Sequence, residues 1–260
     1  MNQAVRYPFA VVGRAATDWA AGFGRFGVFM SALGRGVRDA RTWTPLVVGH
    51  MAALGVASLP IALFIAGFTG IVMALQASYT LTGAVPLYFV GVLVGKTMIL
   101  ELGPVLTGLA LAGRVGANIA AEIGSMRVTE QIDALETLGY DPFAYLVVPR
   151  VIAGVIMFPI VVAFANTIGV IGGWITAINL LDMSTPEFVR GLRLFFVPFD
   201  ITYSLIKAAS FGIAVTTIGS FYGFNTLGGA AAVGRSTTQA VVVSSMLILV
   251  LDAFWAVVLL

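Results

Sequence analysis

Long apolar stretches alternate with short polar segments along the chain. Five of them reach or exceed the ~20 residues that a helix needs to cross a hydrocarbon core. They predict membrane spans at 46–81, 87–112, 151–180, 201–224 and 239–260. The first stretch is long for one span and contains Pro60, so it predicts a tilted helix, a kinked helix or an elbow followed by a span.

Two local signals refine this pattern. Ser184 and Glu187 have the Ser-x-x-Glu spacing that begins a helix, which predicts a short helix between the third and fourth spans. Paired glycines four residues apart permit close approach of neighbouring helices. Such pairs occur at Gly91/Gly95, Gly169/Gly173 and Gly219/Gly223.

The amino-terminal part has a different periodicity. Apolar residues recur there at alternating steps of three and four, which predicts a helix with one apolar stripe opposite Arg14, Asp18 and Arg25. An aromatic stripe opposite arginine is typical of a helix in the membrane interface; packing on the rest of the protein is the alternative. We therefore expect an interfacial helix in 1–42 and a membrane domain in 43–260. The stripe comprises Phe9, Val12, Ala16, Trp19, Phe23, Phe26, Met30, Leu33 and Val37.

Composition agrees with a membrane protein. Of the 260 residues, 59% are hydrophobic and 10% charged, with a mean hydropathy of +1.01, whereas soluble proteins carry about 25% charged residues. We predict an all-α integral membrane protein. The absence of cysteine excludes disulfides and thiolate metal sites, and His50, the single histidine, excludes a multi-histidine centre. We expect no metal site and no catalytic residue.

Charge indicates the orientation. Arg35, Arg38 and Arg41 precede the first apolar stretch, which places the amino terminus in the cytoplasm by the positive-inside rule. Five spans then put the carboxyl terminus outside, whereas a re-entrant hairpin at 46–81 would reverse every later side. Arginine near the amino end favours lipid headgroups as its partner and not nucleic acid.

Residues 113–142 form a polar island between apolar stretches. Val128, Ile132 and Leu135 share one helical face, and acidic residues occupy the other. Gly139 and the Asp-Pro pair at 141–142 end the pattern. This predicts a short amphipathic helix at 128–138 that docks a soluble partner; a merely solvated loop helix is the alternative. The island's acids are Glu122, Glu130, Asp133, Glu136 and Asp141.

Four ionisable residues lie inside predicted spans, namely Lys96, Glu101, Lys207 and Asp252. Each costs about 2.5–3.5 kcal/mol to insert unless it has a partner or a cavity. Lys207 and Asp252 lie at similar depth on successive spans, which suggests an ion pair that either is structural or belongs to a transport pathway. Glu101 has Lys96 as a possible partner, or it could be protonated.

The polar island and its surroundings resemble a known family. The run ELGPVLTGLALAGRVGANIAAEIGSMRVTEQIDALETLGYDP at 101–142 is similar to the MlaE/YrbE permeases, the membrane subunits of ABC-type lipid transporters that work with MCE proteins. Further matches are LQASY at 75–79, VPRVIAG at 148–154, LIKA at 205–208, GRSTTQAVVVSS at 234–245 and LDAF at 251–254. The resemblance extends from about residue 43 to the end.

The resemblance implies a permease that moves phospholipid or a similar long-chain amphiphile between the bacterial inner membrane and an MCE protein. It implies a cytoplasmic coupling helix at about 117–139 that contacts an ABC ATPase. The chain has no GxxxxGK[ST] phosphate loop, so we expect ATP and Mg on that partner and no cofactor on this chain. The expected coupling residues are Glu122, Arg127, Glu130, Asp133 and Glu136.

The resemblance also implies a homodimer, because ABC transporters have paired halves, and a small STAS-type accessory subunit. Relatives often have arginine before the glutamate of ELGP, where this chain has Leu100. The expected lipid-contacting residues are Leu75, Gln76, Tyr79, Glu101 and Leu102.

Two other functions fit parts of the pattern. An ion-coupled carrier would use the four intramembrane charges as its path. This function leaves the acidic island unexplained, and such carriers usually show inverted repeats, which we do not find in this sequence. The third possibility is a membrane scaffold that holds other subunits and transports nothing. Association with an ATPase and ATP-dependent lipid transfer separate the three.

Overall fold

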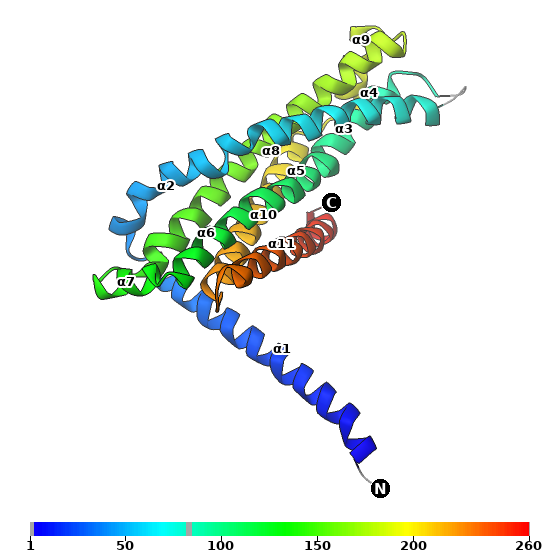
Figure 1. Ribbon diagram of the computed structural model, residues 1–260. Helices are drawn as coiled ribbons and strands as arrows, with labels where there is room; N and C mark the ends of the chain where they lie inside the picture. Colours follow the sequence, from blue (N-terminus) through cyan, green and yellow to red (C-terminus); the bar gives the residue numbers. More distant parts are fainter. Residues whose placement is uncertain (1–2, 82–84, 260) are drawn as a thin grey trace.

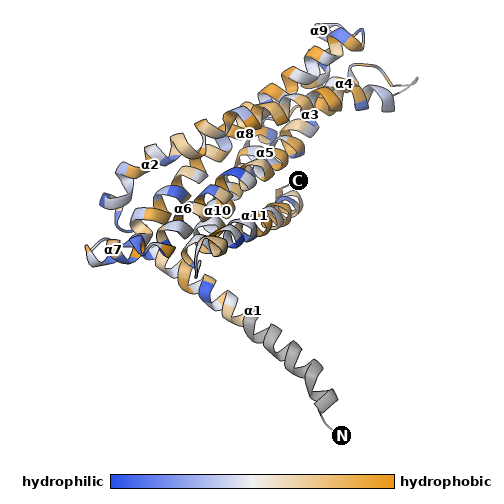
Figure 2. Ribbon diagram, viewed as in Figure 1, coloured by the Kyte–Doolittle hydropathy of each residue, from blue (hydrophilic) through white to orange (hydrophobic). Residues whose placement is uncertain are grey.

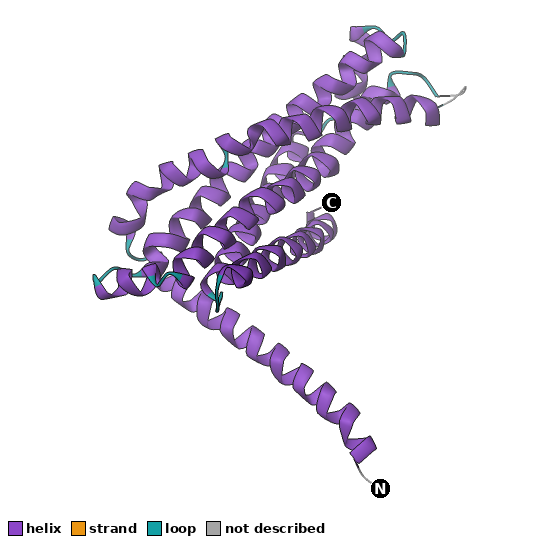
Figure 3. Cartoon of the chain, in the orientation of Figure 1, coloured by secondary structure: helices purple, strands orange, loops and turns teal. Residues whose placement is uncertain are grey.

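The computed structural model describes residues 3–81 and 85–259, with side chains from residue 20 onward. The described backbone is helical and contains no strand (Figure 3). Within it, five helical stretches are long and apolar enough to cross a membrane: Ala40–Thr80, Phe89–Val128, Phe143–Leu180, Pro198–Phe224 and Ala230–Leu259. The predicted all-α membrane fold is confirmed.

The helices form an elongated bundle (Figure 1). α8 (Val148–Leu180) is its centre and packs most extensively on α3 (Leu59–Thr80) and α10 (Pro198–Phe224). α11 (Ala230–Leu259) lies on α10 and α6 (Ala117–Val128). Apolar residues run along the long helices, whereas hydrophilic positions gather at α7 (Gln131–Thr137), one end of the bundle (Figure 2).

Close glycine contacts explain the tight packing at the centre. A Cβ atom on Gly70 would lie 1.8 Å from the carbonyl oxygen of Gly169, and one on Gly172 would lie 2.5 Å from that of Gly67. Only helices without side chains at these positions can approach so closely. The other two predicted pairs also lie at helix contacts, since Gly91 meets Phe188 of α9 (Thr185–Leu194) and Gly219 meets Gly116.

The first stretch bends but continues in one general direction (Figure 1). α2 (Ala40–Leu54) is followed by a 3₁₀ turn (Val56–Ser58) and then by α3. Pro60 lacks the N–H that would bond the carbonyl of Val56, and Gly55 lies directly against Met157. Of the expected alternatives, the structure therefore shows a kinked helix.

The second stretch is longer than predicted. One helical path runs from Phe89 to Val128, where the sequence pattern ends the span at residue 112. It comprises α4 (Phe89–Thr97), a π-helical turn η2 (Met98–Leu102), α5 (Gly103–Leu111), a second π turn η3 (Ala112–Gly116) and α6. At 1.5 Å per residue the path is about 60 Å long, twice a hydrocarbon core. The helix continues into the polar island because Ile119 and Ile123 of α6 are buried.

The polar island therefore contains two helices where one was predicted. α6 ends at Val128, and α7 (Gln131–Thr137) follows a break at Glu130, whose φ of 59° is left-handed. The expected helix at 128–138 begins three residues late, but its faces are as predicted: Ile132 is buried and Asp133 is exposed. Gly139, at φ 83°, ends α7 as predicted.

The remaining elements connect the long helices. α1 (Gln3–Gly36) leaves the bundle at the α7 end (Figure 1). Beyond α7, a π turn η4 (Phe143–Val147) leads into α8. α9 (Thr185–Leu194) joins α8 to α10 at the opposite end, and Ser184 donates its backbone N–H to the Glu187 carboxylate at 2.9 Å, as the capping motif predicts.

The last third of α1 packs on the bundle. Phe29 and Leu33 are buried, and the Phe29 ring contacts Phe143 and Phe221 at centroid distances of 5.2 and 5.5 Å. Within the expected stripe, Phe23 is 68% exposed. The stripe residues up to Trp19, together with Arg14 and Asp18, lie outside the described side chains, so an interfacial position for residues 1–42 remains a prediction.

Candidate functional site

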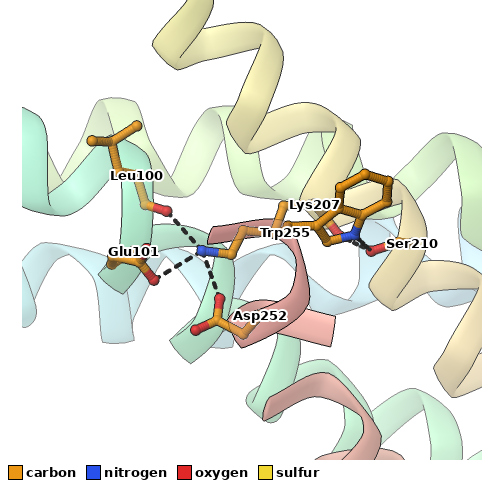
Figure 4. A network of polar contacts seen from close by, with 6 residues as sticks. All are labelled: Leu100, Glu101, Lys207, Ser210, Asp252 and Trp255. Atoms are coloured by element: carbon orange, nitrogen blue, oxygen red, sulfur yellow. Dashed lines mark hydrogen bonds and ion pairs between the residues drawn. The ribbon is translucent and has the colours of Figure 1, made fainter. Parts of the chain in front are cut away.

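The structure joins three of the four intramembrane charges at one lysine. Lys207 Nζ lies 2.8 Å from Glu101 Oε2 and 2.6 Å from Asp252 Oδ1. It also donates a hydrogen bond of 3.0 Å to the carbonyl oxygen of Leu100. Figure 4 shows these groups converging from η2, α10 and α11. The expected pair of Lys207 with Asp252 is confirmed.

The backbone around Glu101 prepares one of these contacts. Pro104 has no N–H to donate to the carbonyl of Leu100, four residues earlier, and the Lys207 ammonium binds that carbonyl instead. Glu101 lies in the π turn η2, where the ordinary helical hydrogen bonds are shifted by one residue. The ELGP motif thus supplies both a carboxylate and a free carbonyl to one cation.

The cluster, comprising Glu101, Lys207 and Asp252, has two carboxylates for one ammonium. The Lys207 side chain is fully buried, whereas Glu101 is 40% exposed and Asp252 is 22% exposed. Lys207 also lies 4.9 Å from the centre of the buried Tyr203 ring. The burial of the lysine is compensated by its partners, while the carboxylates offer an acidic surface within an apolar span.

Ser210 and Trp255 hold the helices beside the cluster. Ser210 Oγ donates to the carbonyl oxygen of Lys207 at 2.7 Å, and Trp255 Nε1 donates to Ser210 Oγ at 2.9 Å (Figure 4). Because Trp255 and Asp252 lie on the same helix, α10 and α11 are joined twice at this level.

The expected partnership of Lys96 with Glu101 is wrong. Lys96 Nζ lies 2.7 Å from Asp200 Oδ2, so it neutralises the first turn of α10 and not the cluster. Lys96 and Glu101 are five residues apart and point to different faces of their helix, whereas Lys207 approaches Glu101 from α10. Sequence spacing along one helix could not reveal this partner.

The other expected lipid-contacting residues are separate from the cluster. Leu75, Gln76 and Tyr79 are exposed near the end of α3, and Tyr79 is 84% exposed. Leu102 is partly buried against the core around Met98. Counting along the antiparallel spans, Tyr79 lies roughly 15 Å from the level of Glu101. The structure places these three α3 residues toward the α9 end of the bundle and does not bring them to the cluster (Figure 1).

The expected coupling residues lie at the opposite end of the bundle. Glu130 and Glu136 are exposed, next to an exposed Leu138 and Tyr140. Arg127 forms an ion pair with Asp133 that connects α6 to α7. Charged and apolar side chains thus share the outer surface of α7, while the buried Ile132 anchors this helix to the core.

Glu122 has an internal partner that the sequence pattern did not reveal. Its Oε1 atom lies 2.8 Å from Nη2 of Arg150, whose side chain is buried at the start of α8. Arg150 also donates to the carbonyl of Leu146. An arginine inside the apolar VPRVIAG run was the available signal, since a buried guanidinium needs a carboxylate. Glu122 joins α6 to α8 and is less free for docking than Glu130.

Among the described residues, no group of three or more His, Asp or Glu side chains is placed to hold a metal ion. The polar groups of the cluster are joined to one another within an apolar bundle. Fold and site together define a multi-pass helical membrane protein with a charged cluster in its spans and a polar extension at one end.

Comparison of the chain with known proteins identifies its family. The profile described as Permease MlaE matches residues 47–258. A probable ABC transporter permease protein of Rickettsia felis is 39% identical over 92% of each chain. A probable ABC transporter permease of Synechocystis is 40% identical over 79% of this chain and 78% of its own. An intermembrane phospholipid transport system permease protein of Haemophilus influenzae is 34% identical over 94% of each chain. The chain belongs to the MlaE permease family and is a transport subunit.

Proposed function

We propose that this chain is the permease subunit of an ABC-type transporter that moves phospholipid between the bacterial inner membrane and an MCE protein. The observation that carries the proposal is the cluster, a fixed polar site inside apolar spans with two partly exposed carboxylates. The Haemophilus relative, an intermembrane phospholipid transport system permease, supports phospholipid as the substrate.

The chemistry of the cluster suits an amphiphile. Apolar span surfaces accept acyl chains, and the free lone pairs of Glu101 and Asp252 accept hydrogen bonds from ammonium or hydroxyl groups of a headgroup. With one ammonium for two carboxylates, the cluster carries a net negative charge and repels phosphate. It would therefore hold the distal part of a headgroup and not its phosphodiester.

ATP hydrolysis on a partner subunit would act on the permease through α7. We infer that the exposed Glu130 and Glu136, with the apolar Leu138 and Tyr140, dock a cytoplasmic ABC ATPase that binds ATP and Mg. The exposed apolar residues support a protein partner, because an isolated apolar patch at the polar end of a bundle is costly in water. This assignment places the amino terminus and α7 in the cytoplasm.

The assembly would contain two copies of this chain, the MCE protein and a small STAS-type subunit. Paired halves follow from ABC architecture. A broad apolar face on α11, including Leu249, Val250 and Phe254, is exposed in the single chain and supports coverage by lipid or by a second copy.

Reconstituted vesicles test the function. The chain, its ATPase and the MCE protein should transfer fluorescent phospholipid only with hydrolysable ATP, and a hydrolysis-deficient ATPase should abolish transfer. Transport by the chain alone under an ion gradient would instead support the ion-coupled carrier that uses Lys96, Glu101, Lys207 and Asp252. Stable assembly without any transfer would support the scaffold.

Charge reversal tests the docking surface. Glu130→Lys combined with Glu136→Lys should reduce the amount of ATPase that co-purifies with the permease. Glu130→Asn is the matched control for the backbone, because asparagine tolerates the left-handed conformation. Unchanged co-purification of the reversed variant would contradict docking at α7.

A further inference from the structure

A second polar site lies at the α9 end of the bundle, away from the cluster. It is a pocket of about 280 Å³ between α4, α8 and α9. Most of its lining is apolar, and it contains two cations and one carboxylate: Lys96, Arg193 and Asp200. The cluster's residues do not line it, so its chemistry must be considered separately.

The carboxylate in this pocket is already occupied. Asp200 Oδ2 accepts hydrogen bonds from Lys96 Nζ at 2.7 Å and from the backbone N–H of Val197 at 3.2 Å, and its side chain is 8% exposed. Asp200 therefore fixes the start of α10 and positions the lysine. The Lys96 side chain is 31% exposed, and its ammonium retains two of its three N–H donors for another partner.

Arg193 supplies an unneutralised charge. It is exposed on α9, and no ion pair among the described residues involves it. The pocket consequently carries a net charge of about +1 at neutral pH. A planar guanidinium beside a lysine ammonium is well suited to bind phosphate oxygens.

The surroundings place this pocket at a membrane surface. The connection from α9 to α10 and the first turn of α10 expose Phe195, Phe196 and Phe199 at 53%, 44% and 43%. Aromatic residues at the start of a span are typical of the membrane interface, and phospholipid phosphates lie at that depth. Phe196 and Ile99 line the pocket itself and offer apolar contacts beside the cations.

We propose that this pocket binds the phosphodiester of a membrane phospholipid, with Arg193 and Lys96 as its ligands. The volume is near the lower end of the ~300–1,000 Å³ of small-molecule pockets, so it holds a phosphate and glycerol while the acyl chains remain in the bilayer. As a place where transported lipid is held, the site rests on the proposed function; lipid binding itself does not.

The position suggests how this site relates to the cluster. Ile99 of the pocket wall and Glu101 of the cluster both belong to η2. The pocket is cationic and the cluster is anionic, so the two sites would hold different parts of a headgroup at successive stages.

Photo-cross-linking tests the site. The complete transporter is placed in phosphatidylcholine vesicles with a trace of phosphatidylglycerol bearing a photoactivatable group next to its phosphate. Cross-links to 185–200 are measured while unlabelled phosphatidylglycerol competes. Arg193→Gln should weaken apparent binding about tenfold, the loss of one charged hydrogen bond. Arg190→Gln is the matched control, because Arg190 lies on the same helix but rests on the Tyr88 ring, 5.1 Å from its centre; it should change binding less than twofold.

A second variant and a competition experiment with inorganic phosphate complete the test. If Arg193→Gln does not fold, Lys96→Gln combined with Asp200→Asn replaces the ion pair by two amides and should also weaken cross-linking. Equal cross-linking in Arg193→Gln and Arg190→Gln overturns the proposal. Inorganic phosphate at millimolar concentration should not displace the lipid; complete displacement would identify free phosphate as the ligand and overturn it.

The transfer assay separates this inference from the proposed function. If the wild type transfers lipid but Arg193→Gln binds it normally, the pocket is not the site and the function stands. If the wild type transfers none while Arg193→Gln loses cross-linking, the site stands and the function fails.

Discussion

Lys207 Nζ lies 2.6 Å from Asp252 Oδ1, and the same ammonium lies 2.8 Å from Glu101 Oε2. One fully buried cation thus connects three spans. Glu101 and Asp252 remain partly exposed, at 40% and 22% of their side-chain surface, and leave an acidic surface. The ion pairs give the cluster a structural role, and the proposed function adds contact with the lipid headgroup.

Removing the cation should destabilise the protein. Lys207→Met preserves much of the side-chain length but leaves two carboxylates without their partner, which costs about 3–5 kcal/mol. We expect a lower melting temperature in detergent. Adding Glu101→Gln and Asp252→Asn should recover most of the loss, because no unpaired charge remains. Equal melting of the single and triple variants would contradict the ion-pair account.

The sequence pattern identified the correct charges in this cluster but not all of their partners. Equal depth on successive spans sufficed for Lys207 and Asp252. The partner of Glu101 could not be predicted in this way, because it depends on a contact between η2 and α10, and this contact depends on how spans distant in sequence pack. Lys96 was assigned to Glu101 because the two are near in sequence, although its true partner, Asp200, was visible at the start of the fourth span.

The secondary structure likewise contains elements that the sequence predicts and elements that it does not. The five apolar stretches and the ends at Ser184 and Gly139 follow from local chemistry, so the sequence predicts them. The continuation of the second span to Val128 does not, because its polar residues are helical through packing on α10 and α11. Likewise, nothing local marks the break at Glu130.

Gly139 should be intolerant of a side chain. At φ 83° it ends α7 with hydrogen bonds from Gly139 N–H to Glu136 O and from Tyr140 N–H to Leu135 O. Gly139→Ala should cost about 1–2 kcal/mol and lower the yield of ATPase-bound complex. Gly113→Ala, at a position with open space and no positive φ, should leave both melting and complex yield unchanged.

The α3–α8 contact should be equally sensitive. Gly70→Ala places a Cβ 1.8 Å from the backbone of Gly169, which cannot move aside as a side chain could. We expect separation of the two helices and a large loss of monodisperse protein in size-exclusion chromatography. Gly67→Ala, one turn earlier, meets only Ile168 at 3.4 Å and should behave as the wild type; similar profiles for both variants would contradict this packing.

The start of α9 should loosen in acid. Hydrogen bonds from the Ser184 hydroxyl and backbone N–H lower the pKa of Glu187 below its ordinary value of 4.5. A carboxyl group whose pKa is lower in the folded protein than in the unfolded chain stabilises the fold, and this stabilisation is complete at pH values above the unfolded pKa. It is lost as the pH falls through the folded pKa. Hydrogen exchange in 185–188, corrected for intrinsic rates, should therefore be faster at pH 3 than at pH 6. Glu187→Gln should abolish most of this difference.

The number of lipids moved per ATP hydrolysed is the most direct test, because in the proposed function the cluster contacts the lipid and α7 contacts the ATPase. In vesicles containing the complete transporter, Glu101→Gln retains a hydrogen-bonding side chain at the Lys207 site but removes one charge of the acidic surface. We predict that lipid transfer falls at least tenfold while the ATPase remains bound and continues to hydrolyse ATP. An unchanged ratio of lipid to ATP would show that the cluster does not handle the substrate.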